Sequence, residues 1–142
     1  RTQVSDVPYL EAMAVVVYEM QWRMVVVASN IEMLGDSVIL VPALEALRVR
    51  VRSMTYFVND QALMTSQMWS VTREGYRVFV FYSLPQDAGP LSTAAQTVMG
   101  LLKKSASLFS WVMMEESYTG LWKVWPNVFV ALRKDRPVPQ IP

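Results

Sequence analysis

The chain contains no cysteine and no histidine among its 142 residues. Disulfide bonds, thiol nucleophiles, zinc sites built on Cys or His, and Ser-His-Asp triads each need at least one of these residue types. Those classes of site are therefore excluded. A chain without cysteine can reside in an oxidising or a reducing compartment, so the sequence leaves the localisation unknown.

Other catalytic arrangements are also scarce. Glu115 and Glu116 are adjacent, so on a helix their side chains would point about 100° apart and could not share a proton or a metal ion. The five glycines are scattered and form no phosphate-binding loop. We therefore expect no catalytic residues, no metal and no cofactor, and an enzyme is the less favoured interpretation.

Charged residues are few, at 18% of the chain, whereas hydrophobic residues make up 53%. A soluble domain usually has roughly a quarter of its residues charged, so one small core would not hide all of this apolar surface. The longest uncharged run, residues 88–102, is shorter than the roughly 20 apolar residues that cross a bilayer. The composition predicts no transmembrane segment and favours a protein partner or self-association. Our first hypothesis is a non-enzymatic structural or interaction subunit of a larger assembly.

The pattern of apolar residues predicts an α+β fold with a mainly antiparallel sheet of about five to six strands. The expected elements, in order, are a helix from about Asp6 to Trp22, strands at 23–29 and 38–41, a short helix opened by Pro42, strands at 48–58, 63–72 and 76–84, a long helix at about 92–115, and terminal strands interrupted at Pro126. Both faces of the 76–84 segment are apolar, which predicts a central strand.

The length predicts one domain, spanning residues 1–135. Residues 136–142, which follow it, are rich in proline and favour an extended tail.

Arg48, Arg50 and Arg52 alternate with valines. Alternation predicts a strand with one charged face, although a helix through residues 48–54 is the alternative. Three guanidinium groups at about 7 Å spacing would fit an anion such as a phosphate backbone. A net charge of +1 gives no general attraction for a polyanion, so we expect these arginines to be structural or to meet an acidic protein. A nucleic-acid-binding module remains an alternative function.

Asp60 follows Asn59 in a turn near Tyr56. A buried Asp with Tyr donors would suit an isomerase or dehydratase with a curved sheet closed as a cone, or a small-ligand pocket of the same shape. Ordinary turn chemistry is the favoured explanation of the Asn-Asp pair. A small-ligand-binding or cone-type protein is thus the other alternative function.

The expected helix over residues 92–115 has an apolar stripe that must face the core. Trp111 and Met114 project from its opposite, polar side, close to Lys103 and Lys104 on the helical wheel. A monomer gains nothing from an exposed Trp, and Trp is a common anchor in protein interfaces. These four residues form the predicted partner-binding site.

Overall fold

The computed structural model describes residues 7–31, 35–57, 59–81, 87–103, 109–114 and 128–132. Four helices and five strands alternate along most of this part of the chain. Their bounds are α1 Val7–Glu19, β1 Met24–Asn30, α2 Gly35–Ala46, β2 Arg50–Tyr56, α3 Gln61–Arg73, β3 Val78–Phe81, α4 Ala88–Leu102, β4 Ser110–Met114 and β5 Val128–Leu132.

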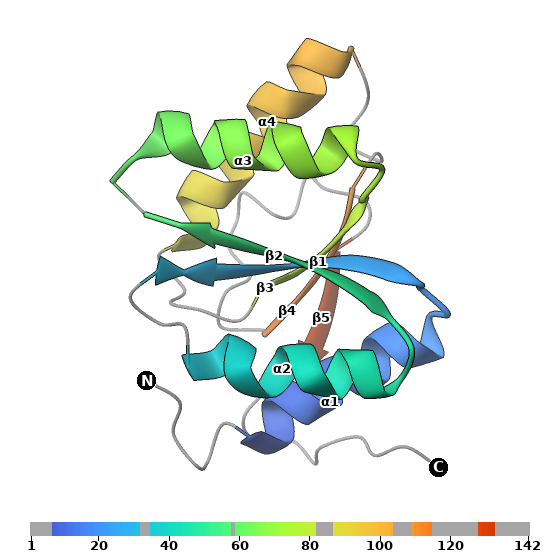
Figure 1. The fold of residues 1–142 in the computed structure, drawn as a ribbon. Helices are drawn as coiled ribbons and strands as arrows, with labels where there is room; N and C mark the ends of the chain where they lie inside the picture. The colour runs from blue at the N-terminus through green and yellow to red at the C-terminus, as the bar shows by residue number, and fades with distance from the viewer. Residues whose placement is uncertain are drawn as a thin grey trace.

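The five strands form one sheet in the order β2-β1-β3-β4-β5, and every neighbouring pair is parallel. Figure 1 shows the sheet between two helical layers, with α1 and α2 on one face and α3 and α4 on the other. The predicted mainly antiparallel sheet is therefore wrong. The cone-shaped sheet expected for the isomerase-like alternative required antiparallel strands, so that fold is wrong as well.

Two segments expected to be strands are helical, and this difference explains the error. Residues 38–41 lie within α2, and residues 63–72 lie within α3. Runs such as Val-Ile-Leu-Val have high strand propensity, but propensity is a weak bias that tertiary burial overrides. With a helix in place of each strand, the neighbouring strands are joined by crossover connections, which make them parallel.

The strands are apolar on both faces because both faces are covered. In β1, Val25 and Val27 belong to a core beneath α1 and α2, whereas Val26 and Ala28 belong to the core beneath α3 and α4. All four residues of β3 are buried, as expected for a central strand. The prediction for this segment is confirmed.

The helix expected to open at Pro42 begins earlier, at Gly35, and contains Pro42 in its interior. Proline lacks the N–H that would bond to the carbonyl of Val38. The residue is exposed, so water can reach that carbonyl. Leu40 and Leu44 on the opposite side are buried, and this burial supports the helix across the proline.

The long helix also differs from its prediction, because α4 ends at Leu102 rather than near residue 115. Lys103 has a left-handed backbone with φ of 55°, a conformation that ends a helix. The chain then enters β4 at Ser110. The residues of the predicted apolar stripe that lie within α4 face the core: Leu91, Ala95 and Val98 are fully buried, and Leu102 is half-buried.

No helix in the described ranges is long and apolar enough to cross a membrane. The tail at residues 136–142 lies outside the described residues, and the expected single domain over 1–135 stays a prediction.

Candidate functional site

The parallel sheet has a carboxyl edge, where β1, β2 and β3 end and helices α2, α3 and α4 begin. The helix that follows β1 covers one face of the sheet, and the helix that follows β3 covers the other (Figure 1). The chain therefore leaves these two neighbouring strands in opposite directions. Folds of this kind bind ligands in the crevice that this divergence opens.

A buried polar cluster, formed by Asn30, Tyr56 and Asp87, lies at the carboxyl edge where these strands diverge. Asn30 Nδ2 donates to Asp87 Oδ2 at 3.1 Å, and the Tyr56 hydroxyl donates to the same oxygen at 3.0 Å. The three residues are 5%, 0% and 1% exposed, respectively. A buried carboxyl group is costly unless it is hydrogen-bonded. The two donors meet that requirement.

Each member of the cluster occupies the end of an element. Asn30 is the last residue of β1, and Tyr56 is the last residue of β2, opposite Asn30 in the ladder. Asp87 is the N-cap residue of α4, yet its side chain makes no capping hydrogen bond. Its carboxyl group instead accepts hydrogen bonds from the two strand ends. The cluster thus fastens the start of α4 to the ends of both strands.

The cluster offers recognition chemistry rather than acid-base catalysis. Asp87 lies at the positive end of the α4 dipole, which favours a negative charge there. Neither hydrogen bond pairs a nucleophile with a base. No group of three or more Asp or Glu residues within the described residues could hold a metal ion. The arrangement suits a ligand held by hydrogen bonds at the strand ends.

Asp60 and Gln61 hold the starts of two helices at the same edge through hydrogen bonds. Asp60 Oδ1 accepts the backbone N–H of Leu63 at 3.0 Å, which makes Asp60 the side-chain cap of α3. Gln61 Nε2 donates to the Pro90 carbonyl at 3.1 Å and ties the start of α3 to the first turn of α4. Asp60 is exposed, so it is not the desolvated acid that the cone-type enzyme would need.

Three large apolar side chains are exposed around this edge. Val38 in the first turn of α2 is 71% exposed, Phe57 just after β2 is 46% exposed, and Leu63 in the first turn of α3 is 39% exposed. Exposed apolar groups beside a polar crevice are common at binding sites.

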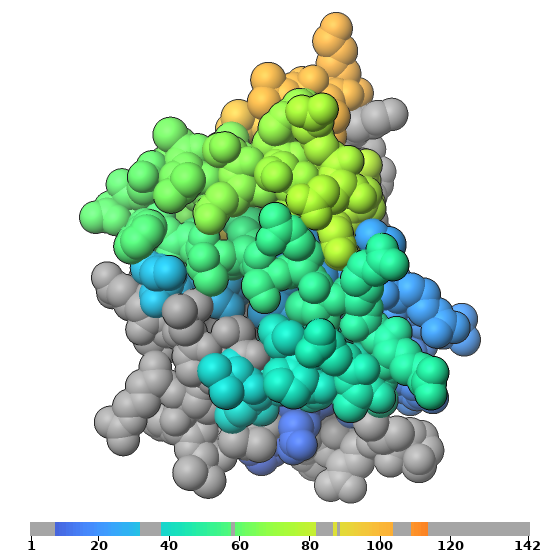
Figure 2. Space-filling view, viewed as in Figure 1, coloured from blue at the N-terminus to red at the C-terminus, as the bar shows by residue number. Residues whose placement is uncertain are grey.

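The three arginines of the predicted row do not all lie on one strand. Arg50 and Arg52 lie on the edge strand β2, which confirms a strand here, but Arg48 lies in the preceding turn with φ of 63°. Arg52 Nε contacts Glu74 Oε1 at 3.2 Å, and Nη2 contacts Oε2 at 3.4 Å. Figure 2 shows β2 on the visible face of the molecule, between α2 and α3. Anion binding by the row stays a prediction.

The described residues do not form the predicted partner-binding helix face, because α4 ends at Leu102 and Trp111 lies on a strand. Trp111 is on β4 and 0% exposed, so its side chain is core and presents no surface. Lys103 is the exposed C-cap residue of α4. The Met114 side chain and Lys104 lie outside the described residues. The predicted helix face and the exposure of Trp111 are therefore wrong, and partner binding by Lys103, Lys104 and Met114 stays a prediction.

Sequence reasoning missed Asn30, Tyr56 and Asp87 as a group. The sequence does hold a signal, because Asn30 and Tyr56 each close a segment of strand character and Asp87 precedes a helix. Its meaning depends on the strands being parallel, since only then do all these positions meet at one edge.

No family model matches the sequence, and no curated protein matches it. Among solved structures, the chain is similar to an extracellular ligand-binding receptor from Verminephrobacter eiseniae, with a TM-score of 0.58 and 7% sequence identity. The similarity covers 77% of this chain and 30% of that receptor. At this identity the likeness shows the fold alone, and the chain spans less than a third of the receptor's length.

Proposed function

We propose that the chain binds a small polar ligand at the carboxyl edge of its sheet, in the crevice between β1 and β3. The Asn30–Asp87–Tyr56 cluster carries this proposal, because it places a hydrogen-bonded carboxyl group at the topological switch point. The solved structure with a similar fold is described as a ligand-binding receptor, which supports the same class of function.

The chemistry of the edge favours a ligand that donates hydrogen bonds, such as a small amine, amino acid or polyol. An acidic ligand would meet the Asp87 carboxyl, and Asp60 is exposed nearby at the start of α3. No described Lys or Arg side chain comes from this edge, since every such residue belongs to the opposite one. A donor-rich ligand avoids the like-charge repulsion.

The role of interaction subunit remains a second proposal. The exposed Val38, Phe57 and Leu63 support it, because another chain placed over the crevice would cover them. Trp111 no longer supports it, since its side chain is buried in this chain.

The test of ligand binding compares two substitutions of the same kind at the same edge. Amino acids, amines and polyols are screened by calorimetry for a compound that binds the unmodified chain. Asp87→Asn should then lower its affinity about 10- to 100-fold, the usual range for a lost charge-assisted hydrogen bond. Asp60→Asn removes the same charge but keeps a capping side chain, so its affinity should change less than about twofold.

Circular dichroism checks that both variants remain folded. If no compound of these classes binds, or if Asp60→Asn weakens binding as much as Asp87→Asn does, the proposal is wrong.

A further inference from the structure

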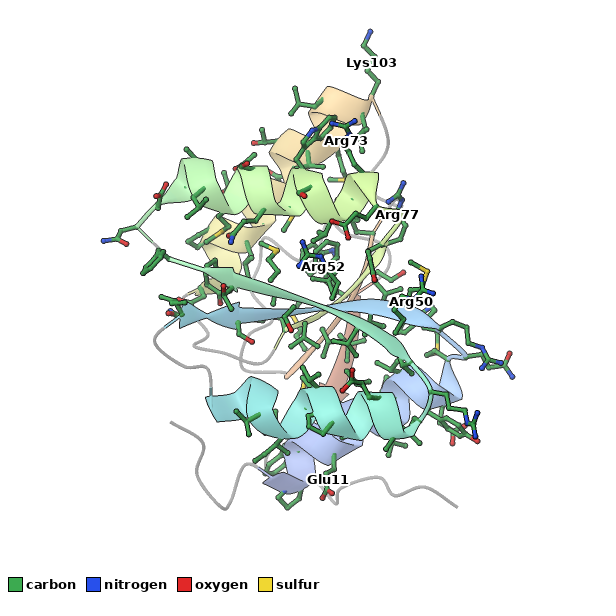
Figure 3. All side chains as sticks on the ribbon, in the orientation of Figure 1. Glu11, Arg50, Arg52, Arg73, Arg77 and Lys103 are labelled. Carbon is green, nitrogen blue, oxygen red and sulfur yellow. The ribbon has the colours of Figure 1, made fainter. Side chains whose placement is uncertain are left out.

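The basic side chains of the described residues all lie at the amino edge of the sheet, opposite the crevice. Strands begin at this edge and helices end there, so the placement follows from the topology. The basic residues are Arg23, Arg48, Arg50, Arg52, Arg73, Arg77 and Lys103. Figure 3 shows Arg50 and Arg77 near the starts of their strands, and Lys103 beyond the end of α4.

Two of these residues serve the fold. Arg52 pairs with Glu74. Arg77 Nη1 donates to the carbonyls of Thr72 at 2.7 Å and Tyr76 at 2.8 Å, which completes the end of α3. The other five basic residues are exposed and form no ion pair with a described residue. These five are Arg23, Arg48, Arg50, Arg73 and Lys103.

Compensation of a helix dipole explains only Arg73 among these five charges. Basic residues stabilise a helix when they occupy its last turn. Helices α1 and α2 have no basic residue in their last turn, and only Arg73 occupies such a position in α3. Arg23, Arg48 and Arg50 belong instead to the turns and strand starts that follow those helices. The exposed Glu19 and Glu45 offset part of this charge.

The same edge exposes large apolar side chains. Tyr18 is 47% exposed, Met20 is 41% exposed and Leu101 is 62% exposed, and each lies at or just beyond the end of a helix. Tyr18, Trp22 and Arg23 also line a hollow of about 220 Å³ between the ends of α1 and α2. Exposed cationic and apolar groups therefore occur together at the amino edge.

From these two sets of residues we infer that the amino edge docks onto an anionic lipid bilayer. Arginine binds the phosphates and carboxylates of headgroups. Tyr and Trp favour the headgroup level, and Met and Leu can enter the acyl boundary. An acidic protein would also satisfy the charges, and the soluble poly-glutamate in the test below separates that occupant from lipid. Docked in this way, the molecule would direct its carboxyl edge away from the membrane, and the inference does not depend on a ligand binding there.

Flotation with phosphatidylcholine vesicles, with or without 30 mol% phosphatidylserine, tests this inference at about 0.1 M salt. We expect binding only to the anionic vesicles. Each Arg near such a surface contributes about a fivefold change in partitioning. The triple variant Arg23→Gln/Arg48→Gln/Arg50→Gln should therefore bind about 100-fold less. Met20→Ser/Leu101→Ser should bind about tenfold less.

Two controls separate this edge from the molecule as a whole. Val38→Ser/Leu63→Ser removes apolar groups from the opposite edge, and Asp60→Asn raises the net charge there. Neither should change vesicle binding by more than about twofold. Circular dichroism confirms the fold of every variant.

Absence of binding to anionic vesicles would overturn the inference, as would equal binding to neutral vesicles. If a control variant lost as much vesicle binding as the variants of the amino edge, the amino edge would not be the docking face. If soluble poly-glutamate bound as tightly as the vesicles and Met20→Ser/Leu101→Ser had no effect, the occupant would be an acidic protein instead of lipid.

Discussion

Trp111 packs its indole ring against two phenylalanines inside the sheet core. It stacks on Phe79 with ring centroids 4.9 Å apart, and it meets Phe109 edge-on at 6.2 Å. Phe79 and Phe109 also meet edge-on, at 5.2 Å. Such geometries add to the stabilisation from burial alone. At this position the sequence shows a large apolar residue, and only the neighbouring strand decides whether it is core or interface.

Trp111→Ala should lower the free energy of unfolding by about 3–5 kcal/mol, because it leaves a cavity beside both phenylalanines. Urea denaturation of the purified chain measures this change. Leu101→Ala is the matched control, since a 62% exposed leucine should change stability by less than about 0.5 kcal/mol. If the Trp111→Ala chain kept its stability and lost only self-association, Trp111 would be an interface residue and not a core residue.

At the scale of elements, the ends of helices organise the candidate site. Helix α3 begins with a side-chain cap from Asp60, whereas Asp87 at the start of α4 is bonded to the strand ends. The two helices are then joined by the hydrogen bond from Gln61 to Pro90. One helix start is stabilised locally, and the other depends on contacts with residues far away in the sequence.

Asp60→Ala should lower the free energy of unfolding by about 1 kcal/mol through loss of the α3 cap. The neighbouring Asn59 is also exposed, and the cap of α3 is Asp60 rather than Asn59, so Asn59→Ala should have an effect within about 0.5 kcal/mol. Thermal and urea unfolding of the two variants should separate them. Equal losses would mean that the cap is unimportant and that the turn itself sets the stability.

The whole molecule is polarised along the strand direction. In the described part of the chain, one edge carries the basic side chains and the other carries the buried Asn30–Asp87–Tyr56 cluster. Large apolar side chains are exposed at both edges rather than on the helical faces alone. The net charge of +1 does not reveal that the basic side chains lie at one edge, because a net charge is a sum that ignores position.

The high apolar content still predicts self-association at micromolar concentration, as measured by light scattering. Phe57 and Leu63 lie exposed at the carboxyl edge, so Phe57→Ser/Leu63→Ser should weaken the association severalfold if that edge is covered by a second copy. Arg73→Gln is the control and should leave it unchanged. A clean monomer across the micromolar range would remove the support for the subunit role.

Several features of this protein follow from local patterns. The absence of Cys and His excludes whole classes of chemistry in any fold. The first helix and first strand lie within a few residues of their predicted bounds, and residues 76–84 contain a central strand because both of its faces are apolar. The strand at Arg50 and Arg52 was also predicted from alternation. These features depend only on which residues occur and how they are spaced.

The tertiary structure decided the rest. Intrinsic propensities differ by less than about 1 kcal/mol per residue, so segment 38–41 could become helical once Leu40 packed with residues of α1 and β1. With a helix at this position, β1 and β2 are joined by a crossover connection and are parallel. Asn30 and Asp87 are 57 residues apart in the sequence, and a parallel sheet is what brings them together. Their contact follows from how the helices and strands pack, and a local sequence pattern could not predict that packing.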